Sequence, residues 1–279
     1  MQASQPSVDH PIHRIVWKVP AYLPYLQPDL TDKAVAAMEN QLSVRLPESY
    51  LTILREQNGG SLRWTHPEFP GRHVWGIGPD FPHIGEEQYW QDEGSDPDLW
   101  RPTDFRRLVP FDGDGHWHLC LDYRRGGEPC VSHIDLEQME DRPIAPDFAA
   151  FLAALGPEKG EFIGLIGISG DTDIDDCKVR LNALFNSSAR DGQGIDDLGY
   201  PTYFWPHLAG ISPNRVPRGF VRHSDPRYAE LKDRLPGEAL RYPEYPDIKV
   251  LLKVSSDSTA DKVVLSGGRV GLRMRKLSL

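Results

Sequence analysis

LPESYLTILREQNGGSL, the stretch Leu46–Leu62, decides the fold of the first half of this chain. Pro47 suits the first helical position, because its fixed φ matches the helix and the N–H that it lacks would have no partner there. Apolar side chains follow at helical spacing, at Tyr50, Leu51 and Leu54. Asn58-Gly59-Gly60 tolerates left-handed φ and ends the helix. The stretch therefore predicts an amphipathic helix, a sharp turn and an extended segment at Ser61–Trp64.

Further helices and extended segments surround this one in residues 1–158. Thr31–Leu42 predicts a helix capped by Thr31, and Phe148–Leu155 predicts another with apolar residues at helical spacing. His13–Trp17 is a candidate first strand. The other extended segments are Leu62–Trp64, Val74–Gly78, Leu108–Phe111, His116–Tyr123 and Cys130–Ile134. This order predicts an α+β fold, an antiparallel sheet flanked by helices.

Several of these motifs resemble those of the SUKH superfamily. The Pro47 helix with its Asn-Gly-Gly turn is similar to the element that opens the sheet in that family. Phe111–Tyr123 resembles its Gly/Asp hairpin, Pro129–Asp135 its next strand, and Phe148–Leu155 its closing helix. The resemblance covers roughly residues 15–157 and implies the fold rather than any catalytic group. Bacterial members of the family are mostly immunity proteins that bind and silence toxins, and fungal relatives act as signalling scaffolds.

Charged residues divide the chain into two halves. Residues 1–158 carry 25 Asp and Glu against 13 Lys and Arg, a net charge of −12, whereas residues 159–279 carry 16 against 18, a net charge of +2. A chain of 279 residues is also long for one hydrophobic core. We therefore predict an acidic SUKH-like domain at 1–158 and a second, smaller α+β domain of unassigned family at 159–279. The acidic domain should attract basic surfaces, although acidity can also simply maintain solubility.

Composition argues against several classes of protein. Hydrophobic residues at 39% and charged residues at 26% are typical of a soluble globular protein. The longest apolar run, Phe148–Leu155, is too short to span a bilayer, and the N-terminus has no signal-peptide pattern. The 3 cysteines are widely spaced, which is not a disulfide framework. We expect a cytoplasmic protein that has no cofactor and contacts neither membrane nor nucleic acid.

The stretch between Gly78 and Leu108 is the best candidate for a partner-binding surface. It interrupts the family-like pattern and mixes aromatic with acidic residues, beginning at Asp80 and Phe81. Aromatic side chains anchor protein interfaces, and carboxylates steer a basic partner. The alternative is a solvated loop whose aromatic rings pack on the sheet. The predicted partner-binding residues are Asp80, Glu86, Glu87, Tyr89, Trp90, Asp92, Glu93, Asp96, Asp98 and Trp100.

A zinc site and an ordinary sheet face are alternative interpretations of the strand Gly115–Tyr123. Strand alternation places a polar set on one face, namely His116, His118, Cys120 and Asp122. With His133 from the next strand these side chains could ligate zinc. The spacing lacks a Cys-x-x-Cys or His-Glu-x-x-His pair, so we interpret it as a half-exposed sheet face and predict no metal site.

The second half carries no complete catalytic motif. Phe162–Ile168 predicts a buried strand, followed by an acidic loop with Asp171, Asp173 and Asp175 and a helix at Asp176–Phe185. The loop has calcium-like spacing, but Asp176 stands where such a loop requires glycine. Acidic residues at a helix N-terminus are favoured by the helix dipole in any case. The remaining predicted elements are a helix at Pro226–Leu235 and strands at Ile248–Val254, Lys262–Leu265 and Val270–Arg275.

Two functions follow from these observations. The family resemblance and the acidic first half favour a non-enzymatic immunity protein that binds a cognate, basic bacterial toxin and blocks its active site. The alternative is a metal-dependent enzyme in the second half, acting through Asp171, Asp173 and Asp175, with the first domain as a targeting or regulatory module. Basic residues between Arg215 and Arg227 do not favour nucleic-acid binding, because the second half is nearly neutral.

Overall fold

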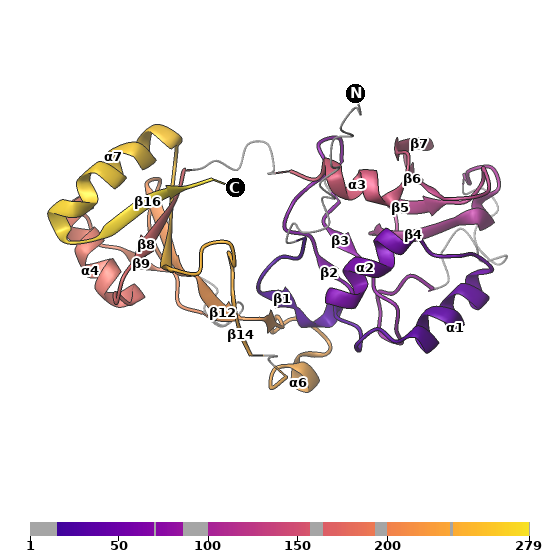
Figure 1. Ribbon diagram of the computed structural model, residues 1–279, viewed down its shortest axis with the longest axis horizontal. Coiled ribbons are helices and arrows are strands. Elements are labelled where there is room, and N and C mark those ends of the chain that lie inside the picture. The colour runs from indigo at the N-terminus through magenta and orange to yellow at the C-terminus, as the bar shows by residue number, and fades with distance from the viewer. Residues whose placement is uncertain are drawn as a thin grey trace, which may run out of the picture. The chain divides into compact units, whose positions relative to one another are not determined.

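The chain divides into two compact units. The computed structural model describes residues 16–69, 71–85, 100–156, 164–192, 200–234 and 237–278 (Figure 1). One unit consists of Met1–Trp17 and Tyr25–Gly156, and the other of Lys18–Pro24 and Pro157–Leu279. The segment Lys18–Pro24, which falls within the predicted first domain, thus belongs to the second unit, because strand β1 (Ala21–Tyr22) pairs there. The domains 1–158 and 159–279 otherwise stay a prediction.

Helices of the first unit begin and end at recognisable signals. Helix α1 (Asp32–Leu42) is capped by the Thr31 side chain, which accepts from Ala34 N. Helix α2 (Glu48–Glu56) follows Pro47, which occupies the cap position rather than the first helical one. Helix α3 (Phe148–Ala154) is capped by Asp147, which accepts from Ala150 N. These helices were expected from the sequence within a residue or two at each end.

An antiparallel sheet of hairpin-connected strands forms the frame of the first unit. It runs in the order β4 (Leu108–Gly113), β5 (Trp117–Asp122), β6 (Cys130–Asp135) and β7 (Glu140–Ala145). A small sheet, β2 (Gly60–Ser61) with β3 (His73–Val74), leads into it, and Trp75 N donates to Phe111 O of β4. Predicted segment Leu62–Trp64 forms only a bridge between Leu62 and Trp17. The α+β fold is confirmed.

The sheet of the first unit is buried on both faces, contrary to the half-exposed polar face that we expected for β5. One face packs on α2 and α3 through an aromatic core that includes Tyr50, Phe111, Phe148 and Phe151. The other face carries Leu108, Cys120, Ile134 and Leu136, and Trp100 and Phe105 pack against them. His118, Cys120 and Asp122 are all buried as a result. Residues 100–108 cover this face, which strand alternation alone does not reveal.

The second unit has a split βαβ topology. Its sheet has the order β16 (Arg273–Leu277), β8 (Gly164–Ser169), β15 (Ile248–Val254), β11 (Ala209–Pro213), β10 (Tyr203–Trp205) and β9 (Arg190–Asp191). All its neighbouring strands are antiparallel. Helix α4 (Ile174–Phe185) follows β8 and helix α7 (Asp257–Gly267) follows β15, and both contribute to one core on the same side of the sheet (Figure 1). The chain order β8-α4-β11-β15-α7-β16 with β15 between β8 and β11 is that of a ferredoxin-like unit.

One predicted strand of the second unit is wrong. Lys262–Leu265 lies inside α7, where Ser256 caps the helix by accepting from Thr259 N. Ala260, Val263 and Gly267 are buried at helical spacing, so the helix period and its cap outweigh the β-propensity of the two valines. Leu265 points away from the core and is 84% exposed.

A structured insertion separates β11 from β15. Strand β12 (Arg215–Pro217) pairs with β14 (Glu238–Leu240), and β13 (Gly219–Phe220) pairs in parallel with β1. Helix α6 (Tyr228–Leu231) lies between β13 and β14 in the sequence. We call residues 18–24 and 214–247 the insertion lobe. It has apolar residues of its own that are buried, namely Ala21, Leu23, Val216, Val221 and Leu231.

Candidate functional site

The structure describes the two ends of the predicted partner-binding surface. Asp80 and Trp100 are described, as is the neighbouring Phe81. The other predicted residues, Glu86, Glu87, Tyr89, Trp90, Asp92, Glu93, Asp96 and Asp98, lie outside the described residues. The described ends therefore define where this surface is attached to the first unit.

Phe81 is the outstanding feature of the first end. Its side chain is 70% exposed, whereas its neighbours Pro82 and Ile84 are buried and Asp80 is partly exposed. An exposed aromatic ring can anchor a protein partner, and it does so best when the loop that carries it is already fixed. The ring lies on the loop Gly76–Gly85, which side chains from three other segments hold in place.

The Gln27 side chain holds this loop through hydrogen bonds to its main chain. Its Nε2 donates to Asp80 O at 2.5 Å and to Pro82 O at 3.2 Å, and its Oε1 accepts from Asp80 N at 3.1 Å. The Gln27 side chain is buried, so these bonds do not compete with water. The main chain on both sides of Phe81 is thus fixed by one amide group while the ring itself remains outside.

Asn58 holds the start of the same loop. Its Oδ1 accepts from Ile77 N at 2.9 Å, and its Nδ2 donates to Ile77 O at 2.8 Å and to Pro28 O at 2.6 Å. The following Gly59 has φ of 93°, and a Cβ there would lie 2.6 Å from Tyr25 O and 2.8 Å from Gly76 N. The Asn-Gly-Gly turn therefore does more than end α2. The Asn58 amide holds the loop that carries Phe81, and the absence of a side chain at Gly59 lets that loop pack closely against the turn.

Helix α1 contacts the last residue of the loop, and helix α2 contacts Trp75, the residue that precedes it. Gln41 Nε2 of α1 donates to Gly85 O at 2.8 Å, at the last described residue before the acidic segment. Tyr50 of α2 donates its hydroxyl hydrogen to Trp75 O. The sequence marked Asn58 only as a helix stop and did not mark Gln27 or Gln41, since a lone glutamine with distant partners has no sequence signal.

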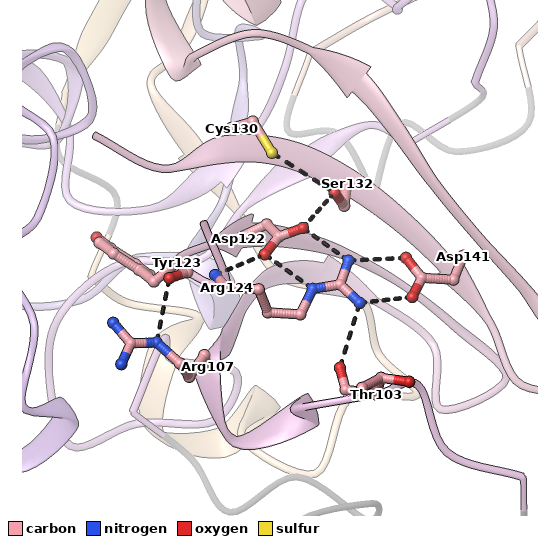
Figure 2. A network of polar contacts seen from close by, with 8 residues as sticks. All are labelled: Thr103, Arg107, Asp122, Tyr123, Arg124, Cys130, Ser132 and Asp141. Carbon is pink, nitrogen blue, oxygen red and sulfur yellow. Dashed lines mark hydrogen bonds and ion pairs between the residues drawn. The ribbon is translucent and has the colours of Figure 1, made fainter. Parts of the chain in front are cut away.

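The second end of the surface is attached to the sheet by an arginine clamp (Figure 2). Trp100 packs against the cluster on the outer sheet face. Arg124 Nη1 donates to Thr103 O at 3.3 Å, and the same guanidinium binds two carboxylates. It meets Asp122 through Nε at 2.9 Å and Nη2 at 2.7 Å, and Asp141 through Nη1 at 2.5 Å and Nη2 at 2.8 Å.

The charges of this clamp are stable. Burial would raise the pKa of Asp122, but hydrogen bonds from Arg124 and Ser132 outweigh burial and lower that pKa. Hydrogen bonds to Asp141 and Asp122 raise the pKa of Arg124 above its usual value. These shifts keep Asp122 and Arg124 ionised near neutral pH, where neither can act as a general acid or base. Its function is to join β5, β6 and β7 to the segment that follows Trp100.

The register between β5 and β6 excludes His133 from the zinc site that was the alternative interpretation of β5. His133 pairs with Leu119 and so lies on the opposite sheet face from His118 and Cys120. Its ring packs on Phe69, with ring centroids 4.4 Å apart. Burial lowers the pKa of His118 to about 4. Across the described ranges, no group of three or more His, Cys, Asp or Glu side chains is placed to hold a metal ion.

The acidic loop of the second unit is occupied with structural tasks. Asp173 caps α4 by accepting from Asp176 N at 2.8 Å, and Asp175 accepts from the Tyr203 hydroxyl at 2.6 Å. Asp171 is exposed. The helix cap thus accounts for Asp173, and Asp175 lies in the first turn of α4, where it is bound by Tyr203.

Comparison with known families assigns the first unit. Residues 29–154 match the SMI1/KNR4 family (SUKH-1), and the match runs from just before α1 to the end of α3. No curated protein matches the chain. The first unit therefore carries a SUKH-1 domain, as the sequence motifs implied. None of the helices in the described part of the chain has both the length and the apolar character needed to cross a membrane.

Proposed function

We propose that this protein, whose residues 29–154 form a SUKH-1 domain, is a non-enzymatic immunity protein that binds a basic bacterial toxin and blocks its active site. The family, in which immunity proteins are common, supports a protein-binding role. Which surface binds and which partner it takes are our inference from the residues of the first unit.

The fixed, exposed Phe81 is the observation that carries this proposal. The ring is 70% exposed, while Gln27 and Asn58 hold the main chain around it. A loop whose main chain is already fixed loses less entropy on association, so more of the apolar area that Phe81 buries appears as affinity. Such aromatic residues near the centre of an interface commonly contribute about 2 kcal/mol or more.

The acidic segment that starts beside Phe81 supports a basic partner. Asp80 adjoins the ring, and the stretch up to Trp100 carries further carboxylates in its sequence. Residues 1–158 have a net charge of −12, so their field would accelerate association with a basic toxin and orient it. Aromatic anchoring and electrostatic steering would then act at the same place.

The test is binding and neutralisation of the toxin encoded beside this protein. The full-length chain should co-purify with that toxin and abolish its activity. Phe81→Ala should weaken binding by about 2 kcal/mol, or about thirtyfold, without lowering the melting temperature. Leu265→Ala is the matched control, since Leu265 is 84% exposed on α7 of the second unit.

Two results would count against the proposal. If the toxin neither binds nor loses activity, the immunity function is wrong. If it binds but Phe81→Ala is indistinguishable from Leu265→Ala, the function stands and the Phe81 surface is wrong.

A further inference from the structure

The insertion lobe of the second unit is another candidate binding surface, and its basic stretch has a charge opposite to that of the first unit. Between residues 215 and 234 the chain carries six Lys or Arg and three Asp or Glu, a net charge of +3. A split βαβ fold needs only a short turn where this insertion stands, between β11 and β15. Structured insertions of this length with their own buried residues are often functional.

Some of the basic charge is neutralised within the lobe. Glu230 Oε1 lies 3.6 Å from Arg227 and 3.3 Å from Arg234, and Glu238 lies 3.8 Å from Arg215. The pairs made by Arg234 and Arg215 are largely exposed and therefore weak. Arg222 and Lys232 have no carboxylate partner among the described residues.

Aromatic rings hold these two cations in place. The Arg222 guanidinium lies over the Tyr22 ring, 5.5 Å from its centroid, and Tyr22 also contacts the Phe220 ring at 5.1 Å. The Lys232 ammonium lies 6.0 Å from the centroid of Tyr228, whose ring also packs on His223 at 4.2 Å. A guanidinium that lies against a ring keeps its in-plane N–H groups directed outward, in the geometry that a carboxylate accepts.

We propose that this surface of the insertion lobe binds an acidic protein segment, with Arg222 and Lys232 as its principal contacts. The partner would present clustered Asp or Glu carboxylates and would differ from the basic partner of the first unit. Strand β1 contributes Tyr22 to the surface, and the Tyr22 hydroxyl donates to Asp225, which fixes the ring beneath Arg222.

The same observations favour an acidic protein over single-stranded nucleic acid. Bases would need open ring faces for stacking, but Tyr22 and Tyr228 are each engaged by a cation and by a second ring. Asp225, Glu230 and Asp233 interrupt the basic residues and would repel a continuous phosphate backbone. The whole chain has a net charge of −10, which further opposes a polyanion but only weakly a short acidic segment.

The test uses the full-length chain and two defined probes of equal charge. Fluorescence anisotropy measures the binding of a labelled short peptide with clustered glutamates and of a labelled short oligothymidylate at low and at physiological salt. The peptide should bind, and the double variant Arg222→Glu with Lys232→Glu should weaken its binding at least about tenfold. The matched control is Lys262→Glu with Arg269→Glu, which makes the same change in net charge on exposed residues of α7 and the turn after it.

The controls decide the outcome. The proposal holds if the lobe variant loses binding while the control, equally folded by circular dichroism, stays within about twofold of the unmodified protein. It is overturned if the peptide does not bind, or if both double variants weaken binding equally. Tighter binding of the oligonucleotide, with loss in the lobe variant, would assign the surface to nucleic acid instead.

Discussion

Each unit holds its candidate binding segment with a buried asparagine. In the first unit, Asn58 binds main-chain groups of Pro28 and Ile77 and so supports the loop that carries Phe81. In the second unit, Asn214 stands at the neck of the insertion lobe. Its side chain binds three main-chain groups that follow β14, namely Tyr242 N, Tyr245 O and Ile248 O.

The two asparagines differ in the size of the segment that each one holds. Asn214 is 0% exposed and also uses its backbone, donating to Lys249 O at 2.8 Å and accepting from Arg241 N at 2.8 Å. Asn58 is slightly exposed and supports one loop. Asn214 thus closes the neck of an entire insertion, whereas Asn58 positions a single turn. A short amide can fix the ends of a variable segment and leave the rest of that segment free to change in sequence.

The largest expected effect comes from Asn214→Ala. The substitution removes the buried hydrogen bonds of Asn214 to Tyr242 N and Ile248 O and the partly buried one to Tyr245 O, which keeps a bond from Ile248 N, so we expect a loss of about 4 kcal/mol of unfolding free energy. Urea denaturation followed by circular dichroism measures it. Hydrogen exchange should report the change in β11 and β15, and faster exchange confined to the first unit would refute this function of Asn214.

The second largest effect should come from acidification, which should destabilise the first unit more than the second. Burial lowers the pKa of His118 from 6.5 to about 4, so its neutral form is favoured in the folded state. The stability associated with neutral His118 is complete above pH 6.5 and is lost as the pH falls toward 4, by about 3 kcal/mol. Burial also lowers the pKa values of His66 and His133, which act in the same direction.

The second unit is the internal control for this pH dependence. Its described histidines, His207 and His223, are exposed, so acid should unfold the first unit while β8 and β15 remain protected from hydrogen exchange. Exchange measured between pH 7 and pH 4 tests this order. Earlier loss of protection in β15 than in β5 would contradict it.

Asn58→Ala should have a smaller effect on stability but a larger one on binding. The variant leaves Ile77 N and Ile77 O unpartnered, which should cost about 3 kcal/mol, less than Asn214→Ala because the site is nearer to solvent. The loop around Phe81 would lose its fixed position, so toxin binding should weaken as well. Asn214→Ala provides the comparison: under conditions where both variants are folded, it should leave toxin binding unchanged, and equal weakening by both would argue against a local effect.

The elements that were predicted well are those with strong local signals. Caps, proline and glycine stops and buried periodicity marked α1, α2, α3 and β15. Strand β7 was missed because its sequence, Glu140–Ala145, is charged and contains Pro143, a composition tolerated on a sheet edge. Lys262–Leu265 was misassigned because its valines suit a strand as well as a helix.

The candidate site also combines features that have a local sequence signal with features that have none. The sequence indicated an acidic, aromatic surface that begins at Asp80, and it indicated the Asn58 turn, but nothing linked the two. Gln27 joins them: its main-chain N donates to Asn58 O, and its side chain binds main-chain groups of Asp80, more than fifty positions away, at a separation that no local pattern can encode. The face of His133 likewise depended on the pairing of β5 with β6, because register decides which side chains meet.

The sequence by itself therefore determined the SUKH-like scaffold of the first half, its acidic character and the turn at Asn58-Gly59-Gly60. These follow from local φ preferences, side-chain periodicity and charge, which neighbouring residues alone specify. Only the tertiary structure decided that Asn58 and Gln27 present Phe81, that Arg124 clamps the far end of the acidic segment, and that Lys18–Pro24 joins the second unit. Those outcomes depend on hydrogen bonds between distant main-chain groups, and such bonds form only after the helices and sheets have packed.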